Sequence, residues 1–123
     1  MSLELLEPNC VWQYFSRLCS IPRPSGHEEG VRRYLLDFAR DHHLTATVDE
    51  VGNIMIRKPA SAGNDVAPAV ILQGHLDMVP QKNLGVDFDF VRDPIQPYID
   101  GDWVRARGTT LGADNGIGVA AAL

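Results

Sequence analysis

The feature that most constrains the fold is the segment AVILQGHLDMVP, residues 69–80, in which a short apolar run leads into polar residues. The apolar residues at 69–72 follow one another without alternation, which predicts a strand that is covered on both of its faces. Strands of that kind are typical of the interior of an α/β sheet. The segment therefore predicts that the chain has the α/β fold class.

Local patterns predict two helices before this strand. Pro8 suits the first turn of a helix, and the spacing of Val11, Phe15 and Leu18 continues that helix. Ser25 followed by Glu28 has the form of a capping box, which predicts Ser25 as the N-cap of a second helix. The apolar stripe predicted for the second helix consists of Val31, Tyr34, Leu35, Phe38, Ala39 and His42.

Two hairpins and a third helix are also predicted. Residues 44–59 have the pattern of two strands joined by a turn at 50–53, with the second strand running through Ile56. Residues 97–108 predict a hairpin with its turn at Asp100-Gly101. Residues 111–123 predict a glycine-rich turn that opens a helix. Because no helix-stop residue follows this helix, we expect the chain to be the front part of a longer protein.

Composition and charge exclude several partners and compartments. The net charge of −5 argues against nucleic acid and anionic membranes as partners. No apolar run approaches the ~18 residues of a membrane span. The N-terminal segment carries acidic residues and no basic region, unlike a secretory signal. Cys10 and Cys19 lie roughly 13 Å apart along a helix, too far for a disulfide, which predicts two buried thiols in a reducing cytoplasm.

His75 and Asp77 form the first candidate site. Residues two apart in a strand point to the same face, and the carboxyl end of an interior strand opens onto the crevice where α/β proteins bind ligands. One ring nitrogen of the histidine can bind a metal while the carboxylate accepts a hydrogen bond from the other nitrogen. Gly74 lets other groups approach. The alternative, a hydrogen-bonded pair with no metal, stays open.

Asp114 is the second candidate, because it lies where the glycine-rich turn meets a helix N-terminus. Its carboxylate can bridge two divalent cations about 3.5–4 Å apart. Two alternatives compete with this interpretation. Asn115-Gly116 has the form of a hairpin turn, although the alanine-rich continuation is helical. The spacing of Gly116, Gly118 and Ala121 fits a dinucleotide-binding fingerprint, although no apolar strand directly precedes it.

The motifs IPRPSGHEE, ILQGHLDMVPQK and GDWVRARGTTLGADNGIGVAAAL together resemble the N-terminal part of the aminoacyl-histidine dipeptidases, a family of co-catalytic zinc peptidases. The resemblance extends over almost all of the chain. It implies a three-layer α/β/α catalytic domain with a mixed sheet, of which residues 1–123 would be the N-terminal portion. A lid or dimerisation domain would follow. It also implies a cytoplasmic, homodimeric enzyme that hydrolyses Xaa-His dipeptides such as β-alanyl-histidine.

The resemblance also implies roles for individual residues. His75 would be a ligand of one zinc ion, and Asp114 would bridge two zinc ions, with other divalent metals as possible substitutes. Asp77 would be a catalytic-site residue whose carboxylate clamps the zinc-binding imidazole. The peptide bond between Asp114 and Asn115 would be cis. Hydrolysis would use a water molecule activated by the two metals.

Several groups that the family needs are absent from these residues. The family has an adjacent glutamate pair, one of them the general base, and further ligands, all C-terminal to this part of its pattern. Glu28-Glu29 is predicted in the first turn of the second helix instead, and His27, His42 and His43 are predicted at the surface. We therefore expect residues 1–123 alone to be inactive. The alternative is a non-catalytic α/β module that binds partners or self-associates through uncovered apolar surface.

Overall fold

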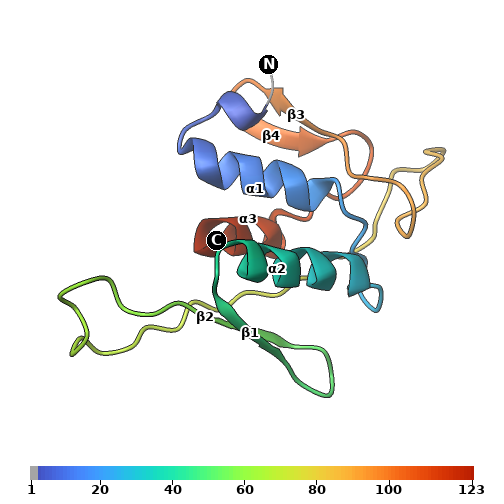
Figure 1. The fold of residues 1–123 in the computed structure, drawn as a ribbon. Coiled ribbons are helices and arrows are strands. Elements are labelled where there is room, and N and C mark those ends of the chain that lie inside the picture. Colours follow the sequence, from blue (N-terminus) through green and yellow to red (C-terminus); the bar gives the residue numbers. More distant parts are fainter. Residues whose placement is uncertain (1–2) are drawn as a thin grey trace. The chain divides into compact units, whose positions relative to one another are not determined.

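The computed structural model describes residues 3–123, which divide into two compact units (Figure 1). Within the described residues, the first unit combines residues 3–31 with Gln73–Leu123, and the second unit is Arg32–Leu72. The elements in chain order are η1 (Leu3–Leu5), α1 (Asn9–Cys19), α2 (Glu29–Asp41), β1 (Thr45–Val48), β2 (Ile54–Arg57), β3 (Pro97–Asp100), β4 (Trp103–Ala106) and α3 (Ala113–Ala122). This mixture of helices and short antiparallel strands confirms the α/β class.

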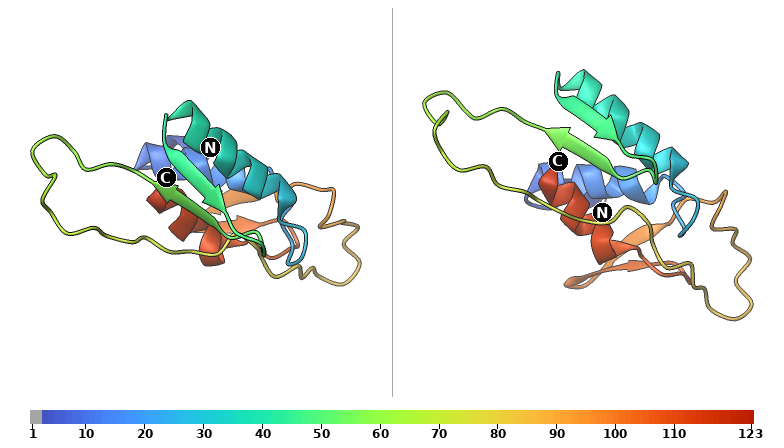
Figure 2. Two further views of the ribbon diagram at one scale, coloured as in Figure 1. Left: turned by 60° about the horizontal axis from the view of Figure 1, so that its bottom comes forward. Right: turned by 90° about the horizontal axis from the view of Figure 1, so that it is seen from below.

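The core of the first unit lies between α1 and α3, which pack side by side (Figures 1 and 2). Phe15 and Leu18 of α1 are each 1% exposed, as is Ala120 of α3. Burying a side chain as large as Phe or Leu contributes roughly 1.5–3 kcal/mol. The predicted spacing of the first helix is therefore confirmed, and its apolar face holds α3 in place.

Both predicted hairpins are present. In the first unit, β3 pairs antiparallel with β4, and Asp100 opposite Trp103 leaves a loop of Gly101 and Asp102. Gly101 has φ 59°, the left-handed region that glycine adopts readily. In the second unit, β1 pairs antiparallel with β2. The carboxylate of Asp49 closes that turn by accepting hydrogen bonds from the backbone N–H groups of Val51 and Asn53.

The predicted start of the second helix is wrong. Helix α2 begins at Glu29, and Ser25 does not cap it. The Ser25 hydroxyl donates instead to a carboxylate oxygen of Asp77 at 2.6 Å, and Glu28 accepts a hydrogen bond from the Gly26 N–H. A hydrogen bond to a charged carboxylate is stronger than a bond between a hydroxyl and a neutral backbone group. The Ser25 side chain therefore favours Asp77 over capping the helix.

The apolar stripe of α2 is confirmed only at some positions. Val31, Leu35 and Ala39 are buried, with exposures of 0%, 5% and 1%. Tyr34 and Phe38 are half-buried, and His42 is exposed.

The predicted buried strand at residues 69–72 is also wrong. These residues pair with no strand within residues 3–123, and Val70, Ile71 and Leu72 are 69–89% exposed. A strand needs a neighbour to satisfy its backbone N–H and C=O groups, and an apolar run does not by itself supply one. Over residues 3–123 the sheets are two antiparallel pairs, so the mixed sheet and the three-layer arrangement stay expectations.

The two cysteines are both free, as expected, but they differ in exposure. Cys19 is buried, whereas Cys10 is exposed, so the prediction of two buried thiols is wrong for Cys10. Nine residues along an α-helix amount to two and a half turns, which places the two side chains on opposite faces of α1. Among residues 3–123, no helix is both long and apolar enough to cross a bilayer.

The difference in burial predicts different thiol reactivity. Burial raises the pKa of the Cys19 thiol to about 11, so little of the reactive thiolate forms near neutral pH. We expect a thiol-directed reagent at pH 8 to label Cys10 in the native protein and to leave Cys19 unmodified, as measured by peptide mass spectrometry. The C10S variant, the matched control, should take up label only after unfolding. Equal labelling rates at the two cysteines would contradict this packing.

Candidate metal centre

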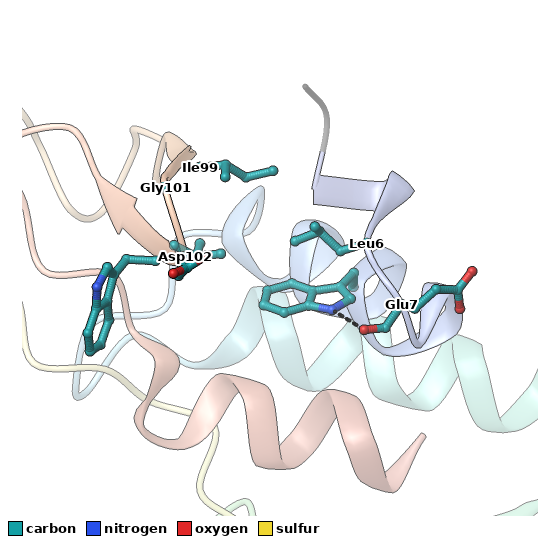
Figure 3. A pocket seen from close by; sticks show the side chains of 8 residues that line it. Leu6, Glu7, Ile99, Gly101 and Asp102 are labelled. Atoms are coloured by element: carbon teal, nitrogen blue, oxygen red, sulfur yellow. Dashed lines mark hydrogen bonds between the residues drawn. The ribbon is translucent and has the colours of Figure 1, made fainter.

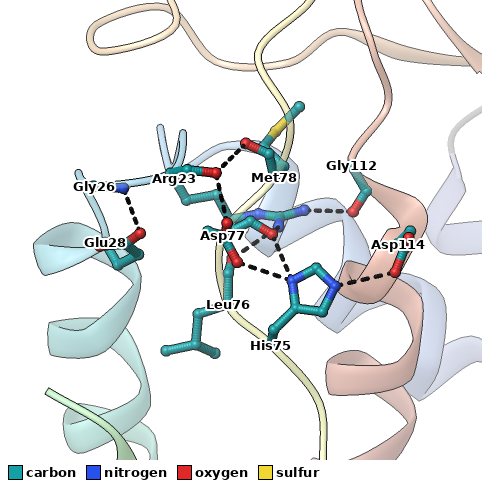
Figure 4. Close-up of polar contacts among 10 residues, drawn as sticks. Arg23, Gly26, Glu28, His75, Leu76, Asp77, Met78, Gly112 and Asp114 are labelled. Carbon is teal, nitrogen blue, oxygen red and sulfur yellow. Dashed lines mark hydrogen bonds and ion pairs between the residues drawn. The ribbon is translucent and has the colours of Figure 1, made fainter. Parts of the chain in front are cut away.

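The candidate site forms in the first unit, where residues 73–78 meet the N-terminal end of α3 (Figure 4). The Nδ1 atom of His75 lies 2.9 Å from a carboxylate oxygen of Asp77, and the Nε2 atom lies 3.1 Å from a carboxylate oxygen of Asp114. The imidazole therefore lies between two carboxylates from different parts of the chain. The side chains of His75 and Asp77 lie on the same face of their segment, as predicted, although residues 75–77 form no strand.

The close approach of these two segments leaves little room for a side chain at Gly74. A Cβ atom there would lie 3.2 Å from a methyl group of Val119 and 3.6 Å from the Cγ atom of Asn115, both on α3. A Cβ atom at position 74 would therefore require the Val119 side chain to shift by a few tenths of an ångström, whereas glycine leaves this contact undisturbed. The expectation that Gly74 lets other groups approach is confirmed.

The start of α3 presents Asp114 outward. Gly112, with φ 73°, precedes the helix, and Asp114 and Asn115 have non-helical backbone angles. The peptide bond between Asp114 and Asn115 is cis, as the resemblance implied. The Asp114 side chain is 96% exposed, so its carboxylate is open to a ligand. Because α3 continues to Ala122, a hairpin turn at Asn115-Gly116 is excluded.

The dinucleotide fingerprint also lacks its expected context. Strand β4 ends at Ala106, and α3 begins at Ala113. A dinucleotide-binding turn joins a strand directly to its helix, whereas here six residues separate the two elements.

The electrostatics of the site favour a cation near His75. The hydrogen bond to Asp114 is the largest cause that raises the pKa of His75, and Asp77 adds to it. If a neutral imidazole gives its one N–H to Asp77, the lone pair of Nε2 faces the negatively charged Asp114 oxygen. Two electron-rich atoms 3.1 Å apart repel each other unless a proton or a metal cation satisfies both. Imidazole nitrogen and carboxylate oxygen are zinc ligands in proteins, so these residues fit the expected metal.

Sequence reasoning missed two residues that support the site. The sequence pattern predicts Ser25 as a helix cap, but its hydroxyl donates to Asp77. No sequence pattern indicates Arg23, whose side chain is buried beside the site and donates to the carbonyl oxygens of Leu76 and Gly112. Those partners lie 53 and 89 residues away in the sequence, so no local pattern could have indicated them.

The remaining candidates lie outside the site. His27 and His43 are exposed, as predicted, and so is His42, which the helical spacing also placed in the apolar stripe. Glu29 is the first residue of α2, whereas Glu28 precedes the helix. Within residues 3–123, no three or more His, Cys, Asp or Glu residues are grouped so that they could hold a metal ion. The site thus supplies two candidate ligands, His75 and Asp114, fewer than the three protein ligands of a catalytic zinc.

A pocket of about 370 Å³ lies elsewhere in the first unit, between the region before α1 and the β3–β4 hairpin (Figure 3). It shares no residue with the His75 site. Its lining consists of Leu6, Glu7, Trp12, Ile99, Gly101, Asp102, Trp103 and Val104.

The chain is similar over almost its whole length to dipeptidases. It is 57% identical over 121 residues to the cytosol non-specific dipeptidase of Escherichia coli (strain K12), an alignment that covers 98% of this chain and 25% of that protein. The crystal structure of aminoacylhistidine dipeptidase from Vibrio alginolyticus matches with a TM-score of 0.97 and 51% identity, over 99% of this chain and 25% of that one. These matches confirm the resemblance to the aminoacyl-histidine dipeptidases.

A more distant similarity is to a protein that is named as a hydrolase. Over 68 residues, 55% of this chain, it is 32% identical to a candidate LysW-lysine/LysW-ornithine hydrolase of Pyrococcus furiosus, 19% of which is covered. No family model matches the sequence. The chain spans about a quarter of the length of the two dipeptidases that it matches.

The hydrogen bond from Ser25 predicts a measurable change in Asp77. That bond is the largest cause that holds the pKa of Asp77 below its usual value, with His75 as a further cause. The S25A variant removes the donor, so we expect the pKa of Asp77 to rise in the metal-free protein, measured by NMR titration of the side-chain carboxyl.

The S20A variant is the matched control, because the Ser20 hydroxyl donates to the carbonyl oxygen of Arg17 and does not contact Asp77. An unchanged pKa of Asp77 in S25A would show that the Ser25 contact is not formed in solution.

Proposed function

We propose that these residues belong to a zinc-dependent dipeptidase in which His75 and Asp114 bind metal ions. The observation that carries the proposal is the His75 imidazole, which faces the Asp114 carboxylate through Nε2 and the Asp77 carboxylate through Nδ1. The names of the relatives support dipeptide hydrolysis. Because the chain spans a quarter of those relatives, the proposal concerns the full-length protein, of which residues 1–123 would form the N-terminal portion of the catalytic domain.

Each residue of the site has a distinct proposed role. His75 would hold one zinc ion, and Asp114 would bridge two, although other divalent metals fit the same oxygen and nitrogen donors. Asp77 would orient the His75 ring, fix its tautomer and increase its basicity as a ligand. Ser25 would keep Asp77 ionised, since its hydroxyl donates to the other carboxylate oxygen. Bound zinc would supply Lewis-acid activation of water and of the scissile carbonyl group.

The overall reaction breaks the amide bond of a dipeptide. Water supplies the hydroxyl group that joins the acyl carbon, and the leaving nitrogen gains a proton and departs as an amine. A glutamate general base and further metal ligands are expected outside residues 1–123, so these residues alone should be inactive. The proposed substrates are Xaa-His dipeptides such as β-alanyl-histidine. The E. coli relative is named as a non-specific dipeptidase, so other dipeptides belong in the test.

We also propose a cytoplasmic location and a homodimeric full-length protein. The name of the E. coli relative, a cytosol dipeptidase, supports the location. The net charge of −5 supports the inference that neither nucleic acid nor an anionic membrane is a partner. A second candidate function, self-association of residues 1–123 by themselves, is supported by the exposure of Val70, Ile71 and Leu72.

The test uses the purified, zinc-loaded full-length protein. It measures the hydrolysis of β-alanyl-histidine and of dipeptides without histidine. We expect D77N to lower kcat/KM by roughly 10–100-fold, because it alters the group that orients a metal ligand. H75A removes a ligand, so it should lower kcat/KM at least as much and also reduce the zinc content measured by elemental analysis. The matched control is His42→Ala, which changes an exposed histidine that follows α2.

The H42A variant should hydrolyse dipeptides at the rate of the wild-type protein. Full activity and full zinc content in H75A would contradict the proposal. Zinc-dependent hydrolysis by residues 1–123 alone would contradict the expectation that the general base lies outside them.

A further inference from the structure

We infer that Arg23 is a positioning residue that sets the separation between His75 and Asp114. Its guanidinium group joins the segment that carries the histidine to the helix start that carries the aspartate (Figure 4). This inference rests on the proposed function, because it assigns Arg23 a role in forming the same metal site.

Arg23 donates hydrogen bonds to both backbone segments that carry the site, the one that contains His75 and the one that leads to Asp114. Its Nη1 donates to the carbonyl oxygen of Leu76, the residue between His75 and Asp77, at 2.9 Å. Its Nη2 donates to the carbonyl oxygen of Gly112, two residues before Asp114, at 2.7 Å. A planar guanidinium group holds its donors in a fixed relation, so these two bonds fix the two backbone segments relative to each other.

The backbone of Arg23 is itself tied to the histidine segment. Its carbonyl oxygen accepts a hydrogen bond from the Met78 N–H at 3.0 Å, and the Ser25 N–H donates to the Met78 carbonyl oxygen at 3.3 Å. Pro24 and Met78 form a parallel bridge between these segments. Arg23 is thus fixed on one side by main-chain bonds and extends its side chain across to α3.

Two glycines make room for the guanidinium group at the start of α3. A Cβ atom at Gly112 would lie 2.8 Å from Nη2 of Arg23, and one at Gly116 would lie 2.6 Å from the same atom. Both distances are too short for real side chains. Gly112 also needs its left-handed backbone, whereas at Gly116 the close approach of Arg23 and of Phe15 explains the glycine.

Stability alone is a weak reason for an arginine here. The side chain is 2% exposed, and burial lowers the pKa of Arg23 from its usual value. Its Nε atom is buried with no hydrogen-bond partner among the described residues. An apolar side chain of similar volume often stabilises a protein as well as a buried charge does. What an apolar residue cannot supply is a rigid pair of donors between two backbone segments. A displacement of about 1 Å within a functional site can lower its activity on the order of 100-fold.

The test compares the full-length protein with its R23M and R23K variants, using Co²⁺ alone as the probe. R23M keeps most of the side-chain volume without donors, and R23K keeps the charge without the planar fork. We expect the Co²⁺ dissociation constant of R23M to rise at least about tenfold, with a changed visible spectrum, and that of R23K to be intermediate. V31A, which opens a cavity at a fully buried position, should lower the urea midpoint and leave Co²⁺ affinity unchanged.

A distance measured in the metal-free protein tests the role of Arg23 independently of the proposed function. Crystal structures of the metal-free wild-type and R23M proteins should show the distance between His75 Nε2 and Asp114 increased in the variant. An unchanged distance and unchanged Co²⁺ affinity in R23M would overturn the positioning role. If R23M does not fold, the same measurements on R23K decide the question. A wild-type protein that binds no divalent metal would overturn the proposed function, and the metal-free distance would still test Arg23.

Discussion

The structure of the candidate site depends on one interaction, the placement of the His75 imidazole between the carboxylates of Asp77 and Asp114. Asp77 is local to His75, whereas Asp114 comes from a helix start 39 residues further along the chain. The interaction exists only if residues 73–78 and α3 approach closely. Gly74 permits that approach, and Arg23 bridges the two segments.

The usual magnitudes of such contacts indicate that the fold positions the site rather than the reverse. The His75 and Asp114 side chains are 49% and 96% exposed, and an exposed ion pair contributes only about 0–1 kcal/mol. Burial of the Phe15 and Leu18 side chains of α1 contributes roughly 1.5–3 kcal/mol each, and α1 packs against α3. The apolar core therefore holds α3 in place, and the carboxylate of Asp114 is left available for a ligand.

The sequence predicted what depends on local spacing and missed what depends on distant partners. The periodicity of α1 and the Asp100-Gly101 turn involve neighbouring residues, so both were predictable. Ser25 followed by Glu28 also has a local pattern, but a carboxylate 52 residues away provides the stronger acceptor for Ser25. Residues 69–72 have the composition of a buried strand, but composition does not determine whether a pairing partner is present.

In the candidate site, too, local spacing was predictable and contacts with distant residues were not. The shared side of His75 and Asp77 follows from their spacing of two residues, whereas Arg23 has no local signal. That Asp114 belongs to the same site was expected from the resemblance to a known family, because no local rule relates residues 75 and 114. The structure brings these two side chains within 3.1 Å of each other.

The most direct measurement is anomalous diffraction at the zinc absorption edge from crystals of the full-length, zinc-loaded protein. We expect two strong peaks, one coordinated by His75 Nε2 and both by the carboxylate of Asp114, with Asp77 still bonded to Nδ1. Zinc bound in the active protein at a place that involves neither His75 nor Asp114 would contradict it.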